Sequence, residues 1–179
     1  LQAYYALIFI GASPVPVNIH LKWEDLKYII DHSEATTIFI DTRLLGSLKP
    51  IRKELTHLSK EVYYLGEGQK PLPDFTRSED RALYSDLLKG SPAPPAFEPP
   101  EGGGIMYTSG TTGPPKGVVQ TRSYPVEYYV ELFMGLIQAL ELTPDDVLYT
   151  CLPLYHGNAL GLSTNMALFL GTSLALSDR

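Results

Sequence analysis

Strand-like and helix-like segments alternate in the first half of the chain, and this alternation restricts the folds it can adopt. Residues 36–40 are β-branched or aromatic, and residues 62–65 are also typical of a strand. The basic segment between them, residues 43–58, is interpreted as a helix. A strand, helix and strand in succession favour parallel pairing, so the pattern predicts an α/β fold with mostly parallel sheets flanked by helices.

The remaining periodic segments fit the same class. Apolar residues from Trp23 to Ile30 recur at helical spacing, which predicts a helix with Trp23 as a core anchor and His32 in solvent near its end. Further segments are predicted to be strands (Gly104–Thr108, Gly117–Thr121, Val147–Cys151), helices (82–88, a long one after Ser123, 159–170) and a strand-like run ending at Ser177.

A proline-rich stretch divides the chain. Residues 91–100 contain five prolines in ten positions, a density that neither a helix nor a central strand tolerates. We therefore expect a first α/β portion at 1–90, a connection at 91–101 and a second α/β portion at 102–179, all within one larger domain. The chain opens in what is interpreted as the middle of a helix and stops just after a strand-like run, so both ends look cut, and we expect a segment of a longer protein.

Composition narrows the classes of partner. The net charge of −6 excludes a general polyanion binder, so no nucleic-acid partner is expected. Cys151 is the single cysteine, which excludes an internal disulfide, and its apolar surroundings predict a buried thiol. Apolar runs are too short to cross a bilayer. We expect a cytoplasmic protein, with peripheral membrane contact or an organelle lumen as alternatives.

The stretch from Ile105 to Gly117 carries the chemical signal. Four hydroxyl side chains occupy five positions, glycines are interleaved, and Lys116 closes the stretch. Glycines allow backbone N–H groups to approach an anion, hydroxyls donate to phosphate oxygens, and lysine adds a mobile positive charge. No acidic residue lies between Gly102 and Arg122. This composition indicates a phosphate-binding loop, and a Gly/Thr-rich hairpin turn is the alternative.

Two familiar phosphate motifs do not describe this loop. A Walker A loop has glycine before its lysine and Ser or Thr after it, whereas Pro115 and Gly117 flank Lys116. The dinucleotide-binding pattern of three spaced glycines is also missing from the chain.

The stretch Ile105–Lys116 closely resembles the signature loop of the adenylate-forming superfamily, which includes acyl-CoA synthetases, luciferases and peptide-synthetase adenylation domains. The resemblance extends over almost the whole chain, to the segments 11–18, 23–40, 152–157 and 171–173. It implies that the chain is part of the large N-terminal domain of such an enzyme, most like an acyl-CoA synthetase. No residue is assigned as a metal ligand.

The resemblance also assigns roles to residues. Lys116 and His156 would be catalytic, and Tyr155, His156, Asn158 and Leu160 would contact the acid substrate. The ATP phosphates would be held by Thr108, Ser109, Gly110, Thr111, Thr112, Gly113 and Lys116. His156 follows Leu152-Pro153-Leu154-Tyr155 and precedes Gly157, a loop position where functional residues concentrate.

The implied reaction uses ATP, Mg²⁺ and coenzyme A to convert a carboxylic acid, expected to be a fatty acid, into acyl-AMP and then acyl-CoA. The family's adenine, ribose and C-terminal lysine motifs lie beyond Arg179, so the isolated segment is expected to be inactive. Two alternatives remain open: an amino-acid adenylation domain, which the Leu-Pro-Leu-Tyr-His stretch disfavours, and a non-catalytic nucleotide-binding fragment.

Overall fold

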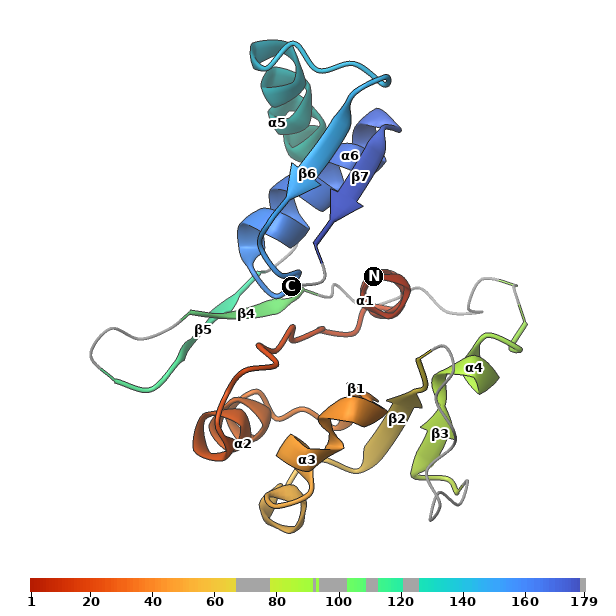
Figure 1. Cartoon of the computed structure of the whole chain (residues 1–179), viewed down its shortest axis with the longest axis vertical. Coiled ribbons are helices and arrows are strands. Elements are labelled where there is room, and N and C mark those ends of the chain that lie inside the picture. Colours follow the sequence, from red (N-terminus) through yellow and green to blue (C-terminus); the bar gives the residue numbers. More distant parts are fainter. Residues whose placement is uncertain (67–77, 92, 94–102, 109–112, 121–125, 178–179) are drawn as a thin grey trace. The chain divides into compact units, whose positions relative to one another are not determined.

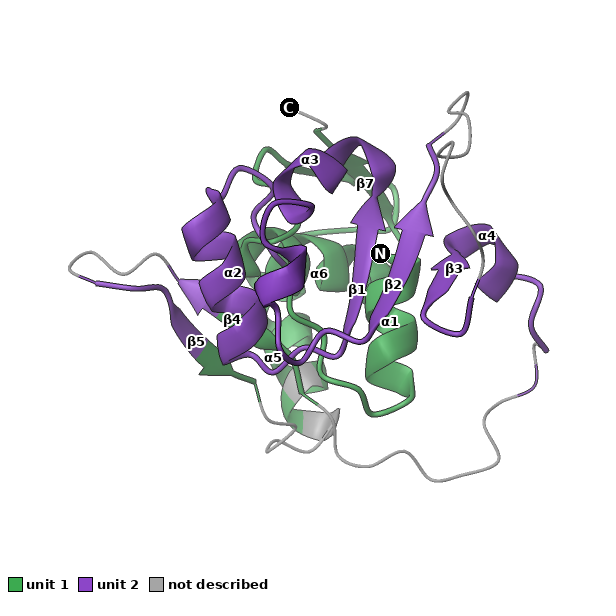
Figure 2. Ribbon diagram, turned by 90° about the horizontal axis from the view of Figure 1, so that it is seen from below, with its two compact units in different colours: residues 1–16, 99–106, 118–179 green, residues 17–98, 107–117 purple. Residues whose placement is uncertain are grey.

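The computed structural model describes residues 1–66, 78–91, 93, 103–108, 113–120 and 126–177. The chain divides into two compact units, shown in different colours in Figure 2. Unit 1 contains residues 1–16, 99–106 and 118–179, and unit 2 contains residues 17–98 and 107–117. Each unit has its own parallel strands, which confirms the α/β class.

Unit 2 is built on a parallel sheet (Figure 1). Its strands β1 (Thr37–Asp41), β2 (Lys60–Tyr64) and β3 (Arg81–Leu83) lie in that order. In register, Phe39 pairs with Val62, which pairs with Ala82. Helix α2 (Trp23–His32) precedes β1 and turns Ile29 and Ile30 inward. The two strands predicted here are confirmed, whereas β3 was missed because three residues carry too little pattern.

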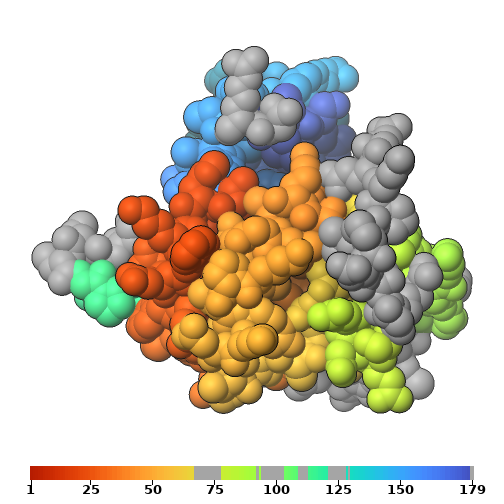
Figure 3. Space-filling model, turned by 60° about the horizontal axis from the view of Figure 1, so that its bottom comes forward, coloured from red at the N-terminus to blue at the C-terminus, as the bar shows by residue number. Residues whose placement is uncertain are grey.

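The helix predicted for residues 43–58 is wrong. The segment forms three short pieces instead: η1 (Thr42–Leu44), α3 (Leu45–Leu48) and η2 (Arg52–Glu54). Pro50 lies between the last two and has no N–H to donate to a continuing helix. The turns form part of the surface of unit 2 (orange in Figure 3). The segment 43–58 as a whole still supplies most of the core of this unit, whose buried members are Ile30, Ile40, Leu45, Leu48, Ile51, Leu55, Leu58 and Tyr63.

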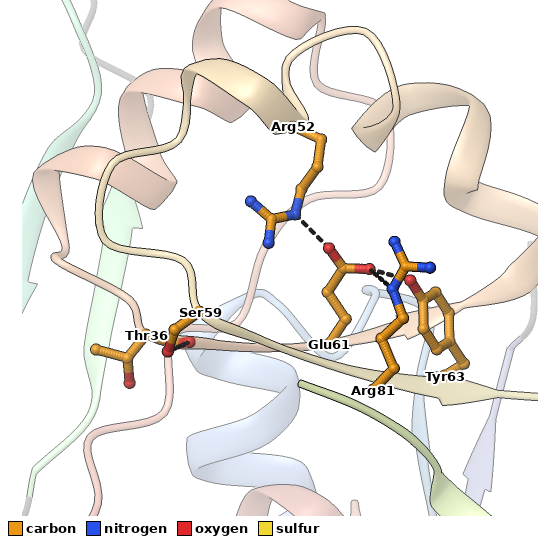
Figure 4. Close-up of polar contacts among 6 residues, drawn as sticks. All are labelled: Thr36, Arg52, Ser59, Glu61, Tyr63 and Arg81. Atoms are coloured by element: carbon orange, nitrogen blue, oxygen red, sulfur yellow. Dashed lines mark hydrogen bonds and ion pairs between the residues drawn. The ribbon is translucent and has the colours of Figure 1, made fainter. Parts of the chain in front are cut away.

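A buried carboxylate lies beside this core (Figure 4). Glu61, on β2, is only 4% exposed. Its carboxylate accepts hydrogen bonds from the Tyr63 hydroxyl and the Arg52 guanidinium, and Arg81 Nε lies 3.8 Å from Oε2. Burial alone would raise the pKa of Glu61, but the two hydrogen bonds and the two positive charges outweigh it and lower this pKa. Nearby, the Ser59 hydroxyl donates to the Thr36 carbonyl over 3.1 Å.

Unit 1 contains a second pair of parallel strands, β6 (Val147–Thr150) and β7 (Ser173–Leu176), with Leu148 opposite Leu174. Between them the chain forms a π-helix, η3 (Asn158–Thr164), and helix α6 (Asn165–Leu170). Helix α5 (Val126–Ala139) contacts α6 through Phe133 and Phe169, whose ring centroids are 5.6 Å apart. Gly171 adopts a φ of 73° at the end of α6, a conformation that glycine allows without strain.

Helix α1 (Gln2–Phe9) is joined to α6 by a long-range bond in unit 1, in which the Tyr5 hydroxyl donates to Asn165 Oδ1 over 2.6 Å. The remaining elements of the described residues are helix α4 (Tyr84–Leu87) and the paired strands β4 (Ile105–Thr108) and β5 (Lys116–Val119). No helix within the described ranges has both the length and the apolar character needed to cross a membrane.

Two predictions about single residues are wrong. Trp23, the first residue of α2, is 57% exposed, although it lies on the same helix face as the buried Ile30 two turns later. Cys151 is exposed as well, since it follows the last residue of β6. In both cases an apolar local sequence was taken as a sign of burial.

Candidate active site

The base of the predicted phosphate loop is formed by the ends of two paired strands. β4 ends at Thr108 and β5 begins at Lys116, and these residues flank the loop within unit 2. The Thr108 hydroxyl donates to the Lys116 carbonyl across 3.4 Å, the long end of hydrogen-bonding range. Of the other residues predicted to bind phosphate, Gly113 is described and exposed. Ser109, Gly110, Thr111 and Thr112 lie outside the described residues.

Lys116 supplies an available positive charge at this base. Its side chain is exposed, and it forms no ion pair with any residue in the described part of the chain. A Cβ added at Gly113 would meet no atom within 4 Å, so the backbone there is open to approach. A free ammonium group, a hydroxyl and open glycine backbone form a donor set suited to phosphate oxygens.

The second group of predicted site residues lies in unit 1, in the turn between β6 and η3. The backbone N–H of His156 donates to the Pro153 carbonyl over 2.9 Å, and its own carbonyl accepts from Leu160 over 3.1 Å. The His156 ring is exposed and lies 4.8 Å from the Tyr155 ring, at 41°. Both backbone groups are therefore fixed, while the ring nitrogens have no hydrogen-bond partner among the described residues.

The helix after His156 has a π register, which the sequence did not reveal. Thr164 is 1% exposed, and its hydroxyl donates over 2.8 Å to the carbonyl of Ala159, five residues earlier. Of the two predicted acid-contacting residues in this helix, Asn158 is exposed and Leu160 is 4% exposed. π-Helical turns carry an energetic cost and occur often at functional sites, so this segment is a candidate wall of a substrate pocket.

The two groups belong to different compact units. Tyr155, His156, Asn158 and Leu160 are close in the chain and share one turn and helix of unit 1. Thr108, Gly113 and Lys116 belong to unit 2. Sequence reasoning missed two contacts near these groups, the Thr164 bond and a bond between His32 and Tyr107. Thr164 could have been noticed as a hydroxyl side chain within an otherwise apolar helix. Tyr107 could have been noticed because it directly precedes the predicted phosphate loop.

Among the described residues, no group of three or more His, Cys, Asp or Glu side chains is arranged to hold a metal ion. Mg²⁺ often keeps several waters and binds through substrate phosphates, with few protein ligands. The residues at the loop base are donors, which suit the phosphates and not the metal.

A family model described as "AMP-binding enzyme" matches residues 1–179. A 4-hydroxybutyrate–CoA ligase of Metallosphaera sedula is 30% identical over 91% of this chain. A long-chain-fatty-acid–CoA ligase of Thermus thermophilus is 32% identical over 89% of it. The matched regions cover 29% and 27% of those relatives, so the chain spans less than a third of their length.

Solved structures of similar proteins have the same fold. A long-chain-fatty-acid–CoA ligase from Archaeoglobus fulgidus superposes over 98% of this chain with a TM-score of 0.72 at 27% identity. An anthranilate–CoA ligase solved with anthranoyl-AMP gives a TM-score of 0.76 at 22% identity, again over 98% of the chain. Each match covers 32% of the larger structure. The fold is that of part of the N-terminal domain of adenylate-forming enzymes.

Proposed function

The chain belongs to the AMP-binding enzyme family, and from that premise we propose that it forms part of an ATP-dependent acid–CoA ligase. The observation that supports this proposal most is the base of the loop. There the exposed Lys116, which has no ion-pair partner among the described residues, begins one strand, and Thr108 with its hydroxyl ends the paired strand. A triphosphate needs positive charge and hydroxyl donors in a protein whose net charge is −6, and this base supplies both.

In the proposed first half-reaction, a carboxylate oxygen of the acid attacks the α-phosphorus of ATP. The bond from that phosphorus to the bridging oxygen breaks, and pyrophosphate leaves with the electron pair, so no proton transfer is needed. Negative charge grows on the leaving pyrophosphate. Lys116, Thr108 and the glycine backbone around Gly113 would hold it, and contacts that strengthen as this charge grows lower the barrier. Mg²⁺ bound to the phosphates would add positive charge at the same place.

His156 would meet the acid. A carboxylate that enters an apolar pocket loses water, and a donor must replace that water. The His156 ring has nitrogens without partners in the described residues, and its backbone is fixed by two hydrogen bonds, so the ring can act as a positioned donor. Tyr155, Asn158 and Leu160 complete the proposed acid side. In the second half-reaction, the thiol sulfur of CoA bonds to the acyl carbon, loses its proton, and displaces AMP.

We further propose a fatty or related aliphatic acid as substrate, in a cytoplasmic enzyme. The apolar segment after His156, with Leu160 and Ala159 buried, supports an aliphatic acid better than an amino acid, whose ammonium group would require an acidic partner. No acidic residue lies between Cys151 and Ser177.

The test is ATP–pyrophosphate exchange by the full-length protein that contains this chain. We expect exchange that depends on an aliphatic acid, followed by thioester formation when CoA is added. Exchange with amino acids alone would favour the adenylation-domain alternative, and ATP binding without exchange would favour a non-catalytic module. The 179-residue segment alone is expected to give no exchange, because it spans less than a third of its relatives.

A further inference from the structure

Three aromatic rings of unit 2 form a cluster next to the loop base. The rings of Tyr28 and His32, both on α2, are stacked with centroids 5.1 Å apart at 27°. The Tyr107 ring meets the His32 ring edge-on, at 5.8 Å and 80°. A hydrogen bond of 2.7 Å joins His32 Nδ1 to the Tyr107 hydroxyl, across 75 positions of sequence. This bond connects a helix near the start of the chain to the last part of β4.

Tyr107 directly precedes Thr108, the first residue of the proposed phosphate-binding set. Burial, and to a smaller extent the neighbouring Tyr28, raise the pKa of Tyr107, so its hydroxyl stays protonated at neutral pH. A neutral phenol can either donate to a ring nitrogen or accept from a ring N–H. The bond therefore persists with either tautomer of His32.

The side-chain hydrogen bond at Thr108, which also links the end of β4 to its surroundings, is weak. β4 has four residues in a two-stranded sheet, and the Thr108 hydroxyl reaches the Lys116 carbonyl only at 3.4 Å. Groups that stabilise a transition state need placement to within about 0.5 Å, and supporting contacts normally provide it. The 2.7 Å bond at Tyr107 is shorter, and it is linked to a helix that contributes Ile29 and Ile30 to the interior.

We propose that His32 is a positioning residue for the phosphate-binding loop: it fixes Tyr107, and through it the backbone at Thr108. This inference rests on the proposed function and assigns a role to a residue that makes no contact with substrate. Stacking on Tyr28 holds the His32 ring at the angle from which Nδ1 reaches the hydroxyl.

The experiment uses the full-length protein and a set of matched variants. His32→Phe keeps a ring to stack on Tyr28 but removes the bond, and Tyr107→Phe removes it from the other side. His32→Asn places a polar atom close to the position of Nδ1. His57→Phe, at an exposed position of the same unit, is the control. ATP affinity is measured by calorimetry, and KM is measured for ATP and for the acid by pyrophosphate exchange.

We expect each Phe variant to weaken ATP binding by roughly three- to tenfold, the range of one hydrogen bond. The KM for the acid should stay unchanged, and the double variant should be no weaker than either single variant. His32→Asn should recover much of the loss, and His57→Phe should match wild type. Thioester formation from pre-made acyl-AMP, which bypasses the phosphates, should be normal in all variants.

The positioning role would be overturned if the losses of ATP affinity in His32→Phe and Tyr107→Phe multiplied in the double variant. Unchanged ATP affinity in a well-folded His32→Phe variant would overturn it as well. So would an equal rise of both KM values together with a lower melting temperature, which indicates a merely structural contact. Failure of the proposed function looks different. Wild type would then bind ATP without acid-dependent exchange, and the calorimetric comparison of the variants would still decide the role of His32.

Discussion

Replacing Glu61 with glutamine tests how the buried ion cluster of unit 2 contributes to stability. The carboxylate is 4% exposed and accepts hydrogen bonds from Tyr63 and Arg52, with Arg81 near the same oxygen. Losing one partner of a fully buried pair costs about 3–5 kcal/mol. The arginine side chains here are 32% and 47% exposed, so water can still solvate them when the anion is gone. We therefore expect Glu61→Gln to lower the free energy of unfolding by about 2 kcal/mol, the loss of the charge component of two hydrogen bonds.

The measurement is urea unfolding at neutral pH, with fluorescence and circular dichroism recorded together. Glu54→Gln is the matched control. Glu54 is an exposed carboxylate in the same unit, and its substitution removes the same charge. We expect the control to stay within about 0.5 kcal/mol of wild type. Tyr63→Phe removes one of the two hydrogen-bond donors and should cost about 1 kcal/mol.

The pH dependence follows from the lowered pKa of Glu61. An unfolded glutamate titrates near pH ~4.3, above the folded value, so the unfolded chain binds more protons between the two pKa values. The contribution of Glu61 to the free energy of unfolding is therefore fully present above the unfolded pKa and is lost as the pH falls through the folded pKa.

Tyr63 depends on pH in the opposite sense. Burial first, and then its bond to Glu61 and the Glu61 charge, raise the pKa of Tyr63 to about 12. Its contribution is present below pH ~10 and is lost as the pH rises through the folded value.

The stability difference between wild type and Glu61→Gln should therefore be constant near neutrality and should shrink in acid. A difference that stays the same from neutral pH down to pH ~3 would show that glutamine disturbs packing and not charge. A neutral-pH difference no larger than that of Glu54→Gln would refute the idea that this cluster stabilises the unit at all.

Three further predictions concern the candidate site. In the full-length protein, Lys116→Ala should slow acid-dependent pyrophosphate exchange by roughly 10²–10³-fold and leave thioester formation from acyl-AMP intact, whereas Lys49→Ala, at another exposed lysine, should have no effect. His156→Phe should reduce kcat/KM for the acid by about tenfold or more with unchanged ATP affinity by calorimetry, and a variant that keeps normal acid kinetics would remove His156 from the site. Thr164→Val should lower the free energy of unfolding in urea by about 1–2 kcal/mol, since it keeps the side-chain shape but removes the buried bond to the Ala159 carbonyl; a neutral effect would contradict a stabilising bond.

The sequence predicted the strands better than the turns that connect them. β1, β2, β6 and β7 overlap runs of β-branched, aromatic or other apolar residues, and β-branched and aromatic side chains are typical of strands. Residues 43–58 show why spacing alone is insufficient. Leu45, Leu48, Ile51, Leu55 and Leu58 recur at intervals of three and four, and all are buried, but short turns around Pro50 bury them as well as a helix would.

Contacts between distant segments could not be predicted in this way. The bond between His32 and Tyr107 joins residues 75 positions apart, and no local pattern at either end indicates the other. The π register of residues 158–164 was equally hidden, because an apolar segment with glycine and threonine is compatible with α and π geometry alike. The chemistry of the loop was visible because it depends on residue types in consecutive positions. The assignments of Lys116, His156 and their neighbours as site residues stay predictions.

The two groups of proposed site residues are held in place by different amounts of structure, and this decides how a substitution in each should be interpreted. Lys116 is exposed, begins β5, and forms no ion pair with any described residue. Removing its charge therefore changes little in the folded state, and a loss of rate reports on the bound phosphates. The helix after His156 is different, since Ala159, Leu160 and Thr164 are all at most 4% exposed. A substitution there alters packing, backbone register and pocket shape together. Stability must consequently be measured beside activity for every variant in residues 158–164, whereas for Lys116 activity alone is informative.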